Sequence, residues 1–133
     1  MVSFDKDSQS SKAVLPYLVI EFLENDIMRF EFTKNVFVTM DMALEMTEVC
    51  KKLSQGKVYL SLKIIAYQLK IQDAVADYLA SDARIKMLRA EAIVLNASTL
   101  KIFYNFYLRI KKPVITMKAF NSEDMAVEWL LTQ

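Results

Sequence analysis

The chain has 133 residues, of which 54% are hydrophobic and 25% are charged, and its formal net charge is +1. This length suits one domain with its own hydrophobic core, and the near-neutral charge argues against a global field that attracts nucleic acid. The sequence contains no histidine, one cysteine and one glycine, which argues against the common zinc sites and against glycine-rich phosphate-binding loops. We therefore expect no metal, no cofactor, no catalytic site and no enzymatic activity.

Residues 1–13 are polar and serine-rich, and they predict a disordered leader ahead of a single domain over residues 14–133. The leader lacks the apolar run of a secretory signal, and no stretch of the sequence has the roughly 18 uncharged apolar residues of a membrane-spanning helix. The lone Cys50 rules out an internal disulfide and is typical of a reducing compartment. We expect a cytoplasmic protein.

Two strands are predicted after the leader, over residues 17–23 and 27–32. The polar residues 24–26 between them predict a tight hairpin, because asparagine and aspartate tolerate the left-handed backbone region. The second strand alternates apolar and polar residues, so we expect the hairpin to lie toward a sheet edge. A further short strand is expected at residues 36–38.

A helix is predicted over residues 40–54. Thr39 or Asp41 can cap its start, and Gly56 follows its end. Apolar residues recur at helical spacing at Met42, Met46, Val49 and Leu53.

The rest of the chain alternates strands with helices. The expected elements are a strand at 58–65, a helix from about 72, a helical turn at 83–88, a strand at 90–95, a helix from 98 to about 109, a strand at 114–119 and a helix from 123. Ser98 or Thr99 is expected to cap the fifth of these elements and Ser122 the last. Such alternation requires crossover connections, so the sequence predicts an α/β fold. We expect a mixed, largely parallel sheet with an N-terminal antiparallel hairpin and about four helices.

Residues 90–131 contain several structural motifs in a fixed order. These are the apolar strand Ala92-Ile93-Val94-Leu95, an aromatic helix with Asn105-Phe106-Tyr107, the pair Lys112-Pro113, and Phe120 before a capped helix with Ala126 and Trp129-Leu130. In this order the chain resembles the SpoIIAA-like group of the STAS-like superfamily (sulfate transporter and anti-sigma factor antagonist). The resemblance implies helices packed on a mixed sheet and a regulatory module, and some members are thought to bind lipid-like ligands.

The resemblance also raises the question of a phosphorylation switch. In the antagonists of that superfamily, a serine at the start of the helix after the central strand accepts a phosphate. The equivalent stretch here, residues 66–72, has no serine or threonine. We therefore expect a module without a phosphoacceptor.

The helix predicted at 98–109 is the first candidate for an interaction surface. It carries apolar residues on two of its sides. Such a helix either packs against other elements on both sides or exposes an apolar patch that can contact a partner. The alternative is that Phe106 packs beneath the loop at residues 111–113. The predicted interaction residues are Ile102, Tyr104, Phe106, Tyr107 and Arg109.

A ligand pocket is the second candidate, lined by Met42, Met46 and Phe103, because methionine fills irregular apolar space. Plain core packing is the commoner role of such residues. Cys50 is expected at the buried edge of its helix, where a thiol is unreactive, and Glu123 with Asp124 is expected to serve the helix dipole.

Residues 84–118 contain eight basic residues and one acidic residue, Glu91. This charge suits an anionic membrane surface, although basic residues more often form a solvated face. Two functions stay open. One is a non-enzymatic module that acts through a protein partner or as a homodimer, and the other is a small carrier of an apolar or lipid-like ligand with peripheral membrane contact. No nucleic acid partner is expected.

Overall fold

The computed structural model describes residues 3–6, 11–100 and 115–133 of the chain. Its strands are β1 (Ser3–Lys6), β2 (Ser11–Leu15), β3 (Leu18–Phe22), β4 (Ile27–Phe32), β5 (Val36–Val38), β6 (Tyr59–Ile65), β7 (Leu69–Ile71), β8 (Leu88–Leu95) and β9 (Thr116–Phe120). Its helices are α1 (Met40–Ser54), α2 (Asp73–Leu79), α3 (Asp82–Ile85) and α5 (Glu123–Leu130), with a 3₁₀ turn at Glu24–Asp26 and helical residues at 97–100.

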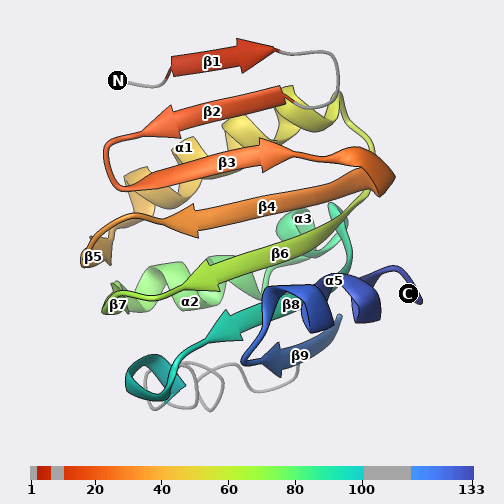
Figure 1. The fold of residues 1–133 in the computed structure, drawn as a ribbon. Helices are drawn as coiled ribbons and strands as arrows, with labels where there is room; N and C mark the ends of the chain where they lie inside the picture. The colour runs from red at the N-terminus through yellow and green to blue at the C-terminus, as the bar shows by residue number, and fades with distance from the viewer. Residues whose placement is uncertain (1–2, 7–10, 101–114) are drawn as a thin grey trace.

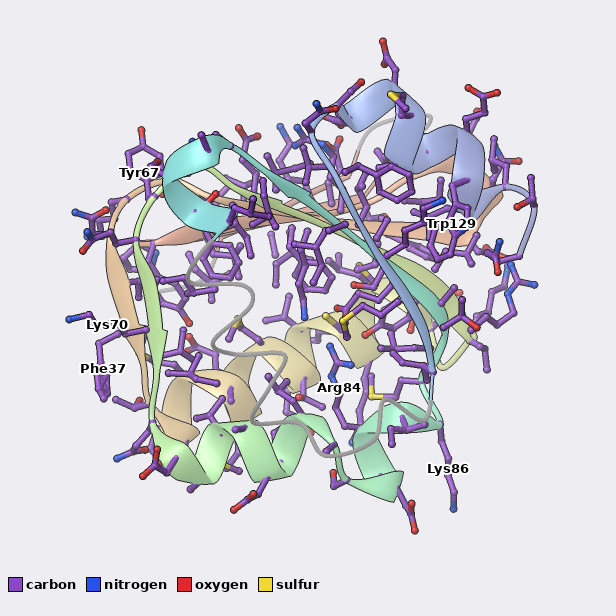
Figure 2. The ribbon with its side chains drawn as sticks, turned by 90° about the horizontal axis from the view of Figure 1, so that it is seen from below. Phe37, Tyr67, Lys70, Arg84, Lys86 and Trp129 are labelled. Atoms are coloured by element: carbon purple, nitrogen blue, oxygen red, sulfur yellow. The ribbon has the colours of Figure 1, made fainter. Side chains whose placement is uncertain are left out.

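The strands form a mixed sheet in the order β1-β2-β3-β4-β6-β8-β9 (Figure 1). The pairs β1–β2, β2–β3 and β3–β4 are antiparallel, whereas β4–β6, β6–β8 and β8–β9 are parallel. The helices α1, α2 and α3 lie on one side of this sheet and α5 lies on the other (Figure 2). The predicted α/β fold with a largely parallel sheet and an antiparallel N-terminal hairpin is confirmed.

The predicted hairpin exists as β3 and β4, but its expected place at the sheet edge is wrong. The strands β1 and β2 extend the sheet beyond β3, so the hairpin lies inside. The polar side of β4 is accommodated there because Arg29 forms an ion pair with Glu123 at the start of α5. The turn residues Asn25 and Asp26 have φ values of 64° and 60°, as their tolerance of the left-handed region predicts.

The leader predicted at residues 1–13 contains regular structure, so that prediction is wrong for residues 3–6 and 11–13. Strand β1 pairs with β2 in antiparallel register, with Ser3 opposite Val14. Ala13 is completely buried. The backbone hydrogen bonds between β1 and β2 do not depend on the side chains. A polar segment without alternating apolar residues can therefore still join the sheet. Residues 1–2 and 7–10 lie outside the described part of the chain.

Helix α1 begins and ends as its sequence predicts. The Thr39 hydroxyl accepts a hydrogen bond from the backbone N–H of Met42 at 3.3 Å, which makes Thr39 the cap. At the other end, Gln55 takes the left-handed conformation with φ of 54°, and Gly56 follows with φ of 81°.

Three local predictions differ from the structure. Strand β7 was not expected, and it pairs in parallel with β5 to form a small second sheet. Leu88 begins strand β8 instead of ending a helical turn. The residue that caps the helix at 97–100 is Asn96, whose side-chain oxygen accepts from the Thr99 backbone N–H at 3.0 Å, because a helix cap precedes the first turn.

The sheet separates two hydrophobic cores. The larger core lies between the sheet and α1, and it includes Leu18, Ile20, Met28, Phe30, Val49 and Leu53. The smaller core lies beneath α5 and includes Leu60, Leu62, Ala90, Ala92, Ala126 and Leu130. Alternate residues of β6 and β8 therefore point to opposite cores. Among the helices of the described ranges, none is long and apolar enough to cross a membrane.

Candidate functional site: a cavity beside a buried charge cluster

A cavity of about 430 Å³ lies on the α1 side of the sheet. Ligand sites for small molecules occupy roughly 300–1,000 Å³ and have mostly apolar walls with few polar groups, so the cavity is large enough for one. Its lining residues are Phe30, Phe32, Phe37, Val38, Ala43, Met46, Thr47, Cys50, Tyr59, Lys63, Ile65, Leu69, Lys70, Ile71, Val75, Leu79, Arg84, Met87, Glu91, Ile93, Leu95 and Thr99.

The apolar walls follow from the period of each element. On β4, Phe30 and Phe32 are two residues apart and point to the same side of the sheet. On α1, Ala43, Met46 and Cys50 are three and four residues apart, so they share the helix side that faces the strands. Two opposed layers thus provide aromatic, thioether and aliphatic surface around one space.

The two-stranded sheet forms the rim of the cavity. Phe37 of β5 lies in register with Lys70 of β7, and both contact the cavity. Their side chains point to the outside of the molecule (Figure 2), and Phe37 is half exposed.

Two charged residues of the central strands meet inside the protein. The Lys63 Nζ lies 2.6 Å from the Glu91 Oε1, although their side chains are only 16% and 4% exposed. Ser61 is the direct neighbour of Glu91 in the parallel register, and its hydroxyl donates to the same oxygen at 3.0 Å. The pairing of β6 with β8 therefore puts a lysine, a serine and a carboxylate on one side of the sheet, where Lys63 and Glu91 line the cavity.

Arg84 adds a second cation from outside the sheet. It belongs to α3 and extends from that helix into the interior between α1 and the strands (Figure 2). Its Nη2 lies 3.6 Å from the Glu91 Oε1, and its side chain is 10% exposed. Lys86, two residues later, points away from the protein in the same view.

Burial and charge shift the proton affinities of this cluster. Burial opposes ionisation of Glu91, but the charges of Lys63 and Arg84 outweigh it and lower the pKa of Glu91 to about 2. Burial lowers the pKa of Lys63, and the Glu91 carboxylate offsets this only in part. Burial also raises the pKa of Cys50 to about 11. Glu91 is therefore a carboxylate and Cys50 a neutral thiol at pH 7.

The structure separates the residues of the predicted pocket. Met46 lines the cavity, whereas Met42 packs beside the core without lining it. Phe103 lies outside the described residues, as do all five predicted interaction residues, Ile102, Tyr104, Phe106, Tyr107 and Arg109. Cys50 is 3% exposed, which agrees with its predicted place at the buried edge of α1.

The buried charges are the residues that sequence reasoning missed. Arg84 and Glu91 are interpreted from the sequence only as part of the charged segment 84–118, and Lys63 only as a residue of the strand predicted at 58–65. A usable signal exists, because Lys63 and Glu91 are charged residues within two mostly apolar strands that are predicted to be parallel. Buried charges are rare unless they are paired, so two opposite charges on such strands predict a pair.

Charged residues elsewhere have ordinary surroundings. Lys86, Arg89 and Lys118 are exposed, as the interpretation of a solvated face predicts. Glu123 lies in the first turn of α5, where its charge interacts favourably with the helix dipole, and it also binds a side chain. Its carboxylate accepts two hydrogen bonds from Arg29, one from Nε at 2.7 Å and one from Nη2 at 3.0 Å.

The layered arrangement is that of the SpoIIAA-like fold. An uncharacterised protein of the DUF3478 family from Shewanella loihica PV-4, whose crystal structure has a SpoIIAA-like fold, is similar with a TM-score of 0.57. The two share 15% sequence identity, and the match covers 98% of this chain and 92% of that one. This likeness confirms the predicted SpoIIAA-like fold and concerns the fold alone.

The sequence shows the family to which this chain belongs. The model of a domain of unknown function, DUF7793, matches residues 21–133, and the chain belongs to this family. Among curated proteins, no significant match is found.

Proposed function

We propose that this protein is a non-enzymatic SpoIIAA-like module that binds one small apolar or lipid-like molecule in the cavity between α1 and the sheet. The observation that supports this most is the cavity of about 430 Å³ with walls of aromatic, methionine and aliphatic side chains. A partly open space of this size with mostly apolar walls is typical of sites for small molecules. A ligand that fills it makes dispersion contacts with the described lining side chains.

One further observation argues against a phosphorylation switch. The segment between β6 and α2, residues 66–72, provides no serine or threonine that accepts a phosphate. The protein-interaction function stays a prediction, because its residues lie outside the described ranges.

Titration calorimetry with decanol tests the proposal, since decanol is a flexible apolar chain with a small head. We expect saturable binding with one molecule per chain. Ala43→Leu fills part of the cavity from α1 and displaces about two ligand methylenes, each worth about 0.8 kcal/mol. Its affinity should fall roughly tenfold.

Leu44→Phe is the matched control, because Leu44 follows Ala43 on α1 but is 45% exposed. This variant should bind decanol as the unmodified protein does. If decanol does not bind, or if both variants bind it as tightly as the unmodified protein, the cavity is not a ligand site.

A further inference from the structure

Arg84 is a buried cation with unused hydrogen-bonding capacity. Its ionic contact with Glu91 is 3.6 Å long, which exceeds a hydrogen bond. Within residues 3–6, 11–100 and 115–133, the structure shows no hydrogen bond from its guanidinium. A guanidinium has five N–H donors in a planar fork, and nine-tenths of this side chain is buried. Donors in this position are available to a molecule inside the cavity.

The charges around Arg84 do not balance. Lys63 lies 2.6 Å from Glu91 and so takes most of the neutralising effect of that carboxylate. Two cations and one carboxylate leave a formal charge of +1 in the cluster. Glu91 is the single carboxylate among the described residues that line the cavity. An anion that enters this space meets a positive environment.

The other ionisable groups of the cavity wall do not change this balance. Cys50 and Tyr59 line it from α1 and β6. Burial raises the pKa of Cys50 to about 11, and burial with the neighbouring Cys50 also raises the pKa of Tyr59. Both groups are neutral at pH 7, so the net charge near the cavity comes from Lys63, Arg84 and Glu91.

Apolar walls and a partly compensated buried cation together define a ligand class. We propose that the cavity binds an amphipathic carboxylate whose hydrocarbon chain lies along the apolar wall and whose carboxylate accepts hydrogen bonds from Arg84. This inference rests on the proposed function and names the ligand of the same cavity. The planar fork of arginine matches the two oxygens of a carboxylate, and the water-poor surroundings strengthen the pair.

Paired titrations of decanoate and decanol at pH 7 test the inference, because the two probes share a chain and differ in the head. Hydrogen bonds to charged groups correspond to roughly ten- to hundredfold in affinity. We expect decanoate to bind at least about tenfold more tightly than decanol. Arg84→Gln should abolish that preference and leave decanol binding unchanged.

Lys86→Gln is the matched control, since Lys86 follows α3 closely but points away from the protein (Figure 2). It removes the same charge and should keep the preference for decanoate. Equal binding of the two probes to the unmodified protein would overturn the carboxylate inference and leave the proposed function standing. Binding of neither probe would overturn the proposed function itself.

A measurement on the unmodified protein covers the case in which the Arg84→Gln chain does not fold. Decanoate labelled with ¹³C at its carboxyl reports its own ionisation by NMR. Contact with Arg84 should lower the pKa of the bound carboxyl below that of free decanoate. A bound pKa that is equal or higher would contradict contact with Arg84.

Discussion

The Lys63 ammonium lies 2.6 Å from the Glu91 carboxylate, in the wall of the cavity and between two neighbouring parallel strands. The carboxylate also accepts a hydrogen bond from the Ser61 hydroxyl and lies 3.6 Å from the Arg84 Nη2. Glu91 is therefore the shared partner of three largely buried polar side chains. A buried pair of this kind is a weak source of stability by itself, but losing one partner leaves a buried charge without compensation.

Glu91→Gln should therefore lower the free energy of unfolding by roughly 3–5 kcal/mol. Urea denaturation at pH 7 measures the change. Glu48→Gln is the control, because Glu48 also pairs with a lysine, Lys51, but its side chain is 74% exposed. That variant should differ little from the unmodified protein. A small change for Glu91→Gln as well would contradict the role of the cluster.

The dependence of stability on pH follows from the pKa of Glu91, which is lowered from 4.5 to about 2 in the folded protein. The unfolded chain binds the proton first as the pH falls, so the ionised Glu91 stabilises the fold above about pH 4.5. This contribution is lost progressively between about pH 4.5 and pH 2. The stability of Glu91→Gln should show a smaller slope in that window, and identical slopes for the two proteins would show that the pKa is not lowered.

The bidentate pair between Arg29 and Glu123 joins strand β4 to helix α5 across the smaller core. Its side chains are 20% and 40% exposed, so solvent screening limits the gain. We expect Glu123→Gln to cost about 1 kcal/mol in the free energy of unfolding. Asp124→Asn is the control, since Asp124 shares the first turn and its dipole. Equal effects of the two substitutions would mean that the dipole, and not Arg29, is responsible.

The Cys50 thiol reports on access to the cavity, because it is the single cysteine of the chain and lines that space. Its burial and its pKa of about 11 predict slow reaction with a disulfide reagent at pH 8 and fast reaction after denaturation. Decanol should slow the native reaction further. In a Cys50→Ser chain, Leu44→Cys places a thiol on the exposed side of α1, and this thiol should react quickly with or without decanol. Fast native labelling of Cys50 would contradict a sheltered cavity.

Asn96 links the end of β8 to the residues after β6. Its side-chain oxygen caps the helix at 97–100, and its amide donates to the Ala66 carbonyl at 3.3 Å. Asn96→Ala should cost about 1–2 kcal/mol, and Asn96→Asp should cost less because it keeps the cap acceptor. Chemical denaturation of the two variants measures this order, and the reverse order would assign the stabilisation to the amide donor.

Much of the fold could be predicted from local signals. Helix α1 has a capping threonine, an apolar stripe and a left-handed end, so its bounds agree with the sequence. Strand β1 could not be predicted, because a polar strand is specified by its pairing partner and carries no period of its own. The predicted hairpin position was wrong because β1 and β2 extend the sheet beyond β3, and the sequence of β1 gives no signal of this pairing.

The site was harder to predict than the fold. Met46 could be placed near an apolar space from helical spacing alone. The charge cluster depends on the register that aligns Ser61 with Glu91 and on the turn that brings Arg84 back over the sheet. Neither follows from periodicity, because the side chains meet only when separate strands and a helix are assembled.

The most direct test of ligand binding is an NMR titration of ¹³C-methionine methyl groups with decanol. Met46 lines the cavity, whereas Met125 on α5 is 55% exposed on the other side of the sheet and is the internal reference. The Met46 signal, assigned with Met46→Leu, should shift saturably as decanol is added, while the Met125 signal stays in place. An unmoved Met46 signal, or shifts at Met125 alone, would contradict binding in the cavity.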